Sequence, residues 1–137
     1  ISLSNIHFSF KGYQQRKITD TIPEKESVYP EYLMFGPLPA YGIYARHVKK
    51  LKLKNISFSL DFPDNRSPIF CDDINRLEIK GLDADISKQA SAYVTLKGVK
   101  YTVISDTGLL GLSRKLVDVR GERGEIVLLD RNGGMKE

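Results

Sequence analysis

The sequence repeats one apolar pattern, in which two isoleucine or valine residues five positions apart precede an alternating apolar run. The pattern Ile43, Val48, Leu51, Leu53, Ile56 and Phe58 returns 26 residues later as Ile69, Ile74, Leu77, Ile79, Leu82 and Ala84. A third copy, degraded at its end, follows after 25 residues as Val94, Val99, Thr102 and Ile104, and the first ten residues match the second half of the pattern at an offset of 50. A repeat of this length with strand periodicity predicts the stacked coils of a solenoid.

We therefore expect an all-β fold, a parallel β-helix of about four coils. Each coil would contain a short strand (43–46, 69–71, 94–96) and a longer one (50–60, 76–84, 101–104). The offsets place Leu53, Ile79 and Ile104 in one inward-facing ladder. Asn5 and Asn55 would lie at a turn of left-handed backbone and hydrogen-bond to each other, and Gly81 occupies the same position in the next coil.

The whole chain, 1–137, is expected to form a single domain, with a long Pro-rich loop at 11–41. That loop exceeds the usual length of an unstructured connection and carries Tyr29, Tyr32, Phe35 and Tyr41, which argues against simple disorder. After residue 106 the repeat fades into a possible final strand pair, 115–119 and 125–129. The polar tail 130–137 is expected to fray.

Composition excludes few classes of function. No stretch is long and apolar enough for a membrane span, and no apolar signal-peptide core is visible. Ile1 leads directly into a strand, which favours a segment cut from a longer protein. Cys71, the one cysteine, aligns with Ala45 and Leu96 and is expected to be a small core residue. The net charge of +4 suits an acidic partner such as an anionic polysaccharide, or is only a solvated surface.

The segment 37–84 resembles the C-terminal coils of bacterial glycoside hydrolase family 28, the polygalacturonase-like enzymes of pectin breakdown. The residues that carry the likeness run from Pro37 to Val48, from Leu53 to Phe58 and from Phe62 to Pro68, and it extends more weakly over 1–105. The resemblance implies a right-handed parallel β-helix and a secreted or periplasmic hydrolase of galacturonan or rhamnogalacturonan.

Enzymes of that family hydrolyse the glycosidic bond with inversion at the anomeric carbon. They use carboxylates from an Asn-Thr-Asp segment and an Asp-Asp pair, supported by Gly-His-Gly and Arg-Ile-Lys motifs. Inversion requires an acid and a base on opposite faces of the sugar. Apart from one Asp-Asp, these motifs are absent here, so we assign no catalytic residue and expect the catalytic coils upstream of Ile1. The repeat aligns Asp72-Asp73 with a turn, where a solvated pair is favoured over a calcium, subsite or catalytic role. No metal site, cofactor site or nucleic-acid motif is visible.

The residues assigned to substrate binding are Arg46, His47, Tyr41 and Tyr44. A basic pair beside the long loop would meet the carboxylates of an acidic polysaccharide, and the tyrosines would stack on its sugars. The alternatives are that Arg46 forms a salt bridge with Asp72 of the next coil, and that the aromatic residues fix the loop to the body.

Three functions remain open at this point. The chain is the C-terminal part of a family 28 glycoside hydrolase, a polysaccharide-binding β-helix module without a catalytic half, or a structural β-solenoid segment. In each case the first coil would expose unpaired strand edges, so upstream coils of the same protein or another copy are expected to cover it.

Overall fold

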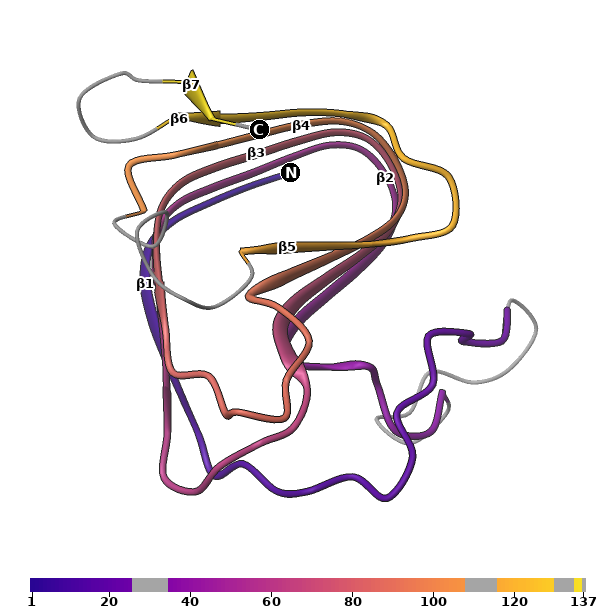
Figure 1. Cartoon of the computed structure of the whole chain (residues 1–137), viewed down its shortest axis with the longest axis vertical. Coiled ribbons are helices and arrows are strands. Elements are labelled where there is room, and N and C mark those ends of the chain that lie inside the picture. Colours follow the sequence, from indigo (N-terminus) through magenta and orange to yellow (C-terminus); the bar gives the residue numbers. More distant parts are fainter. Residues whose placement is uncertain (26–34, 108–115, 130–134, 137) are drawn as a thin grey trace.

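The computed structural model describes residues 1–25, 35–107, 116–129 and 135–136, and in these ranges every regular element is a β-strand. The strands are β1 Ser2–Phe10, β2 Ala40–Leu60, β3 Ser67–Ala84, β4 Val94–Ser105, β5 Val117–Arg120, β6 Glu125–Leu129 and β7 Met135–Lys136. Neighbouring strands from β1 to β6 pair in parallel, and only β7 pairs antiparallel, with β6. The protein is thus a parallel β-solenoid, as the repeat predicts, with about three turns where the sequence predicts about four coils (Figure 1).

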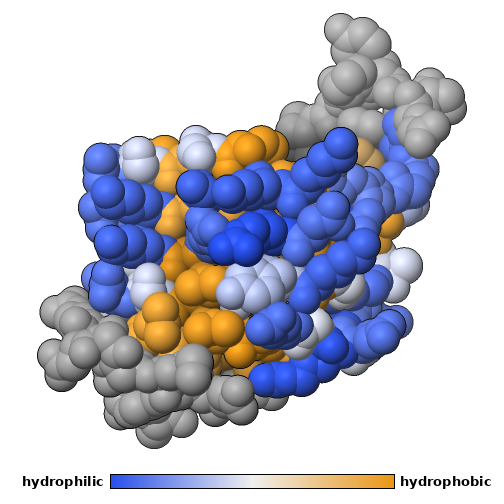
Figure 2. Space-filling view, turned by 90° about the horizontal axis from the view of Figure 1, so that it is seen from above, coloured by the Kyte–Doolittle hydropathy of each residue, from blue (hydrophilic) through white to orange (hydrophobic). Residues whose placement is uncertain are grey.

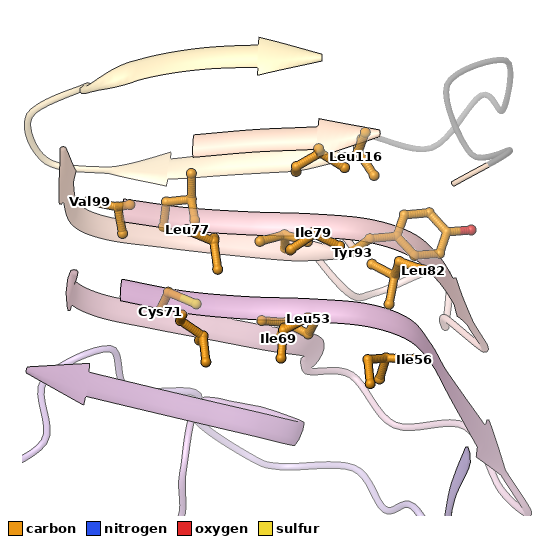
Figure 3. Packing of buried hydrophobic residues seen from close by; sticks show 14 of the residues in the cluster. Leu53, Ile56, Ile69, Cys71, Leu77, Ile79, Leu82, Tyr93, Val99 and Leu116 are labelled. Atoms are coloured by element: carbon orange, nitrogen blue, oxygen red, sulfur yellow. The ribbon is translucent and has the colours of Figure 1, made fainter. Parts of the chain in front are cut away.

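The observed register is the one that the sequence offsets predict. Leu53 pairs with Ile79 and Ile79 with Ile104, and all three are almost completely buried. At the start of the chain, Leu3 pairs with Leu53 and Phe8 with Phe58, which confirms the half-repeat. Figure 3 shows the buried side chains stacked between successive coils.

Each coil has three sides, because β2 and β3 run around two corners without interruption (Figure 1). We name the sides by the paired segments that form them. The first side contains 43–46, 69–72, 94–97 and 117–120; the second contains 2–4, 48–54, 74–80, 99–105 and 125–129; the third contains 6–10, 56–60 and 82–84. The separate short and long strands expected from the sequence are therefore joined into continuous ones.

Both corners consist of residues with left-handed backbone. The first corner holds His47, Asp73, Gly98 and Gly121, and the second holds Asn5, Asn55, Gly81 and Asp106, all with positive φ. Asn, Asp and Gly tolerate this conformation best. The Nδ2 of Asn55 donates to Oδ1 of Asn5 over 2.9 Å, which confirms the predicted ladder of side chains. Asp72-Asp73 therefore lies at a corner, and the Asp73 side chain is largely exposed.

Other expectations need correction or confirmation. The loop, predicted over 11–41, ends at residue 39, because Ala40 and Tyr41 belong to β2. Tyr29 and Tyr32 lie outside the described residues. The final strand pair is present as β5 and β6. The tail 130–137 lies mostly outside the described residues, and the two tail residues that are described, Met135 and Lys136, pair with β6. Among the described residues, no helix is long and apolar enough to cross a membrane.

Candidate binding pocket on the first side

The long loop returns to the body along the outer surface of the first side. Its segment 20–24 is held there by side chains from two strands, β2 and β4, and Figure 1 shows the loop outside the coil next to this side. Lys97 on β4 donates to the carbonyl oxygen of Asp20 over 2.9 Å. Arg46 on β2 donates to the carbonyl oxygens of Ile22, at 2.5 Å, and Pro23, at 3.3 Å. Ile22 is 6% exposed, so the segment also contributes an apolar contact.

Arg46 is thus bound to the loop. Besides the two carbonyls, its Nη2 lies 3.7 Å from Oε2 of Glu24, and its guanidinium lies over the rings of Tyr44 and Phe35 at 5.9 and 5.6 Å. Asp72 is its register neighbour but accepts instead from the Tyr44 hydroxyl, over 3.5 Å. The salt bridge to Asp72 considered from the sequence does not form, because the loop carbonyls and Glu24 occupy the guanidinium.

His47 connects the loop to the next coil. Its Nε2 lies 2.6 Å from Oε1 of Glu24, and its Nδ1 lies 2.6 Å from Oδ2 of Asp73. Hydrogen bonds to Glu24 and then to Asp73 raise the pKa of His47, and the hydrogen bond from His47 lowers the pKa of Glu24. Both ring nitrogens donate when the imidazole is protonated, so this bridge is strongest for the charged histidine.

The two tyrosines differ in their surroundings. Tyr41 is 6% exposed, packs edge-on against Phe10 and Phe58, and donates its hydroxyl to the carbonyl oxygen of Asp85 over 2.6 Å. A register shift between Ala40 and Ile43 accompanies this inward position. Tyr44 is partly exposed, and burial raises its pKa to about 12. Tyr41 has no open face for a sugar, and Tyr44 has one face occupied by Arg46.

A pocket of about 210 Å³ lies beside segment 20–24, at the edge where the connections between coils meet the first side. It is lined by Ile18, Asp20, Pro39, Asn65, Arg66, Ser67, Phe70, Gln89, Ser91, Thr95 and Arg120. The long loop, the connections 61–66 and 85–93, and the strands β3, β4 and β5 therefore all contribute to it. None of the four residues assigned from the sequence lines this pocket.

The polar groups of some lining residues form hydrogen bonds within the protein itself. Arg66 donates to buried Asp64 through Nε and Nη2, at 2.8 and 2.7 Å, and to the carbonyl oxygen of Leu38 through Nη1. Burial alone would raise the pKa of Asp64, but these hydrogen bonds and those from the backbone of Tyr13 and Arg66 hold it below its usual value. Asn65 exchanges two hydrogen bonds with the backbone of Gln15. These residues build the wall of the pocket.

Other lining residues retain unused polar groups. Arg120 donates its Nε to Asp118 over 2.9 Å, and the remaining donors of its guanidinium have no partner among the described residues. The amide nitrogen of Gln89 and the carboxylate of Asp20 have no partner among the described residues. The side chains of Phe70, Ile18 and Pro39 supply apolar surface, and Ile18 is 44% exposed. Donors, one carboxylate acceptor and an apolar wall are the groups that bind a sugar ring carrying a carboxylate.

Metal and thiol chemistry find no support in the described part of the chain. No group of three or more His, Cys, Asp or Glu side chains is arranged there to hold a metal ion. Cys71 is completely buried in the core, as predicted, and burial raises the pKa of its thiol to about 12. A thiol with so high a pKa is unreactive at neutral pH.

Sequence reasoning missed this pocket because its residues share no motif. The repeat does give one signal: Tyr44, Phe70 and Thr95 occupy equivalent outward positions, and an outward phenylalanine predicts a covering segment. Comparison with family models, with curated proteins and with solved structures finds no match to this chain.

Proposed function

We propose that this chain forms the C-terminal coils of a secreted or periplasmic glycoside hydrolase similar to family 28. The substrate would be a pectic polysaccharide, galacturonan or rhamnogalacturonan, and the coils would bind it without performing the chemistry. The observation that carries this proposal is the pocket on the first side, which combines donors of Arg120 and Gln89 that have no partner among the described residues with apolar side chains. A carboxylated sugar fits those groups better than a neutral or a purely apolar ligand.

The same pocket supports binding without catalysis. Asp20 is the only carboxylic acid among the described residues that line it, whereas inversion needs a second one across the sugar. Asp72 and Asp73 do not line the pocket, and Asp73 is engaged by His47 at the first corner. The same pocket would also suit a β-helix module that only binds polysaccharide. Measuring hydrolysis by the full-length protein distinguishes this binding module from the C-terminal coils of a hydrolase.

Binding is tested by titrating the chain with short galacturonate oligomers and with matched neutral galactose oligomers in a calorimeter. We expect galacturonate to bind and Arg120→Ala to weaken it about tenfold, because a charged hydrogen bond at a partly exposed site is lost. Arg123→Ala, which removes an exposed arginine outside the pocket, is the matched control and should bind like the wild type. Equal binding of both sugars, or an unaffected Arg120→Ala variant, would refute the assignment.

Catalysis is tested separately by measuring reducing ends released from polygalacturonate. We expect none from this chain alone. Release that disappears in both Asp72→Asn and Asp73→Asn would move the active site to the first corner and overturn the proposal.

The β1 end of the solenoid favours a second partner, a protein that covers the open strand edge. β1 is the last strand of the stack and pairs with β2 along one edge only. Phe8 and Phe10 stack with Phe58 but remain partly exposed at this end. An open parallel edge with apolar side chains favours coverage by further coils of the same protein or by another copy. Light scattering distinguishes the two, since a dimer of this chain supports the second.

A further inference from the structure

The outer surface of the second side carries a strip of basic residues on two neighbouring strands. Lys50, Lys52 and Lys54 alternate along β2 with buried leucines, and Arg76 and Lys80 lie beside them on β3. We call these five residues the basic strip. Figure 2, which looks onto this side of the coil, shows a largely hydrophilic surface there. The strip contains one carboxylate, Glu78, at its centre.

The charges of the strip are only partly neutralised within the protein. Glu78 is shared by Arg76, at 2.7 Å, and Lys52, at 3.6 Å, and Lys80 lies 3.8 Å from Asp106 at the second corner. Lys50 and Lys54 form no salt bridge with a described residue, although the charge of Lys50 helps to lower the pKa of Glu78. The chain as a whole has a formal charge of +4, so the strip accounts for much of the excess of positive charge.

The register places like charges side by side. Lys50 pairs with Arg76, and Lys54 pairs with Lys80. Parallel strands lie about 4.8 Å apart, and alternate residues on one strand are about 6.6 Å apart, so the cations form a flat and narrow grid. Like charges opposite each other on neighbouring strands destabilise a sheet. An anionic ligand along the grid would remove this repulsion.

We propose that the basic strip binds a linear polysaccharide with carboxylate groups along its length, a polyuronate. A single extended chain matches the width of two strands, whereas duplex nucleic acid and a lipid surface are much broader. Glu78 favours the same choice, because its carboxylate accepts hydrogen bonds from sugar hydroxyls but repels closely spaced phosphates. Arg76, stacked on Tyr101 at 4.6 Å, gives the strip one rigid cation beside an aromatic ring.

This surface differs from the pocket in place and in what it would recognise. The strip lies on the second side and the pocket on the first, with the corner of His47, Asp73, Gly98 and Gly121 between them. The pocket fits one sugar unit, and the strip needs several carboxylates on one chain. The inference shares with the proposed function only the class of polymer and does not depend on the pocket.

The test compares two triple variants that lose equal charge. The strip variant carries Lys50→Gln, Lys54→Gln and Lys80→Gln. The matched variant carries Lys11→Gln, Lys25→Gln and Arg123→Gln, at exposed positions elsewhere. Binding to immobilised polygalacturonate is measured for both, at low and at physiological salt, after circular dichroism has shown that each variant is folded. The whole comparison is repeated in an Arg120→Ala background, so that a failure of the pocket assignment leaves this test intact.

We expect the strip variant to bind polygalacturonate about tenfold or more weakly and to lose most of the salt dependence, because fewer cations are neutralised. The matched variant should retain at least half of the wild-type affinity. Equal losses in the two triple variants would overturn the proposal, since binding would then follow net charge alone. Tighter, strip-dependent binding to duplex DNA or to phosphatidylserine vesicles would overturn it as well.

Discussion

Asp64 offers the sharpest test of how the connections between coils are held. The carboxylate is completely buried and accepts four hydrogen bonds, from Nε, Nη2 and the backbone nitrogen of Arg66 and from the backbone nitrogen of Tyr13. It therefore joins the connection 61–66 to the start of the long loop. Asp64→Ala removes both acceptor oxygens, and with them all four hydrogen bonds, and leaves the Arg66 guanidinium, whose side chain is 12% exposed, without its counter-charge.

Breaking a buried ion pair from one side costs about 3–5 kcal/mol. We expect Asp64→Ala to lower the free energy of unfolding by about 3–4 kcal/mol, near the lower end because Arg66 keeps some access to water. Urea denaturation followed by circular dichroism measures this change. Asp83→Ala, at an exposed position on β3, is the matched control and should change the stability by less than about 0.5 kcal/mol. A loss of less than 1 kcal/mol for Asp64→Ala would show that the ion pair does not hold the connection.

Three further predictions concern the coil itself. Ile79→Ala should lower the free energy of unfolding by about 2–5 kcal/mol, whereas Lys80→Ala, at an exposed position, should change it little. Equal effects of the two substitutions would refute the inward-facing ladder of Leu53, Ile79 and Ile104. Because the folded pKa of His47 is raised, its bridge to Glu24 contributes fully below the unfolded pKa of about 6.5 and is lost as the pH rises through the folded pKa. The stability difference between wild type and His47→Gln should shrink from pH 6 to pH 9, and a constant difference would exclude the charged bridge. Asn55→Ala should lower the free energy of unfolding by about 1 kcal/mol or more, and Asn55→Gly should lower it less, because glycine adopts the left-handed backbone of this position without strain and alanine does not. Urea denaturation measures both changes, and the reverse order would contradict this account.

The sequence predicts the coils well because their determinants are local and repeated. Period-two alternation and the offsets place Leu53, Ile79 and Ile104 correctly, and the asparagine pair marks the second corner. The single domain and the likeness to family 28 stay predictions. So does substrate binding by Arg46 and His47, two β2 residues whose side chains contact the loop segment 20–24.

The pocket and the position of Tyr41 could not be predicted in the same way. Tyr41 turns inward because the register shifts by one residue between Ala40 and Ile43, and a one-residue shift is invisible in a hydrophobic pattern. The pocket combines Asp20 and Gln89 from two connections with Arg120 from β5, where the repeat in the sequence has faded. Their proximity depends on the path of the loop, which contacts such as Lys97 with Asp20 determine only in three dimensions.

The three corners of a coil differ in how they tolerate changes of length. Two are single left-handed residues, and an insertion there would move every following side chain out of its ladder. The third is a connection of variable length, from the short 61–66 to the long 11–39, and the strands on either side of it remain stacked in parallel, with one single-residue shift of register between Ala40 and Ile43. Residues can therefore be gained or lost at one edge of the solenoid without disturbing the stack. Since the pocket opens along that edge, such changes would alter what the protein binds while leaving its fold unchanged.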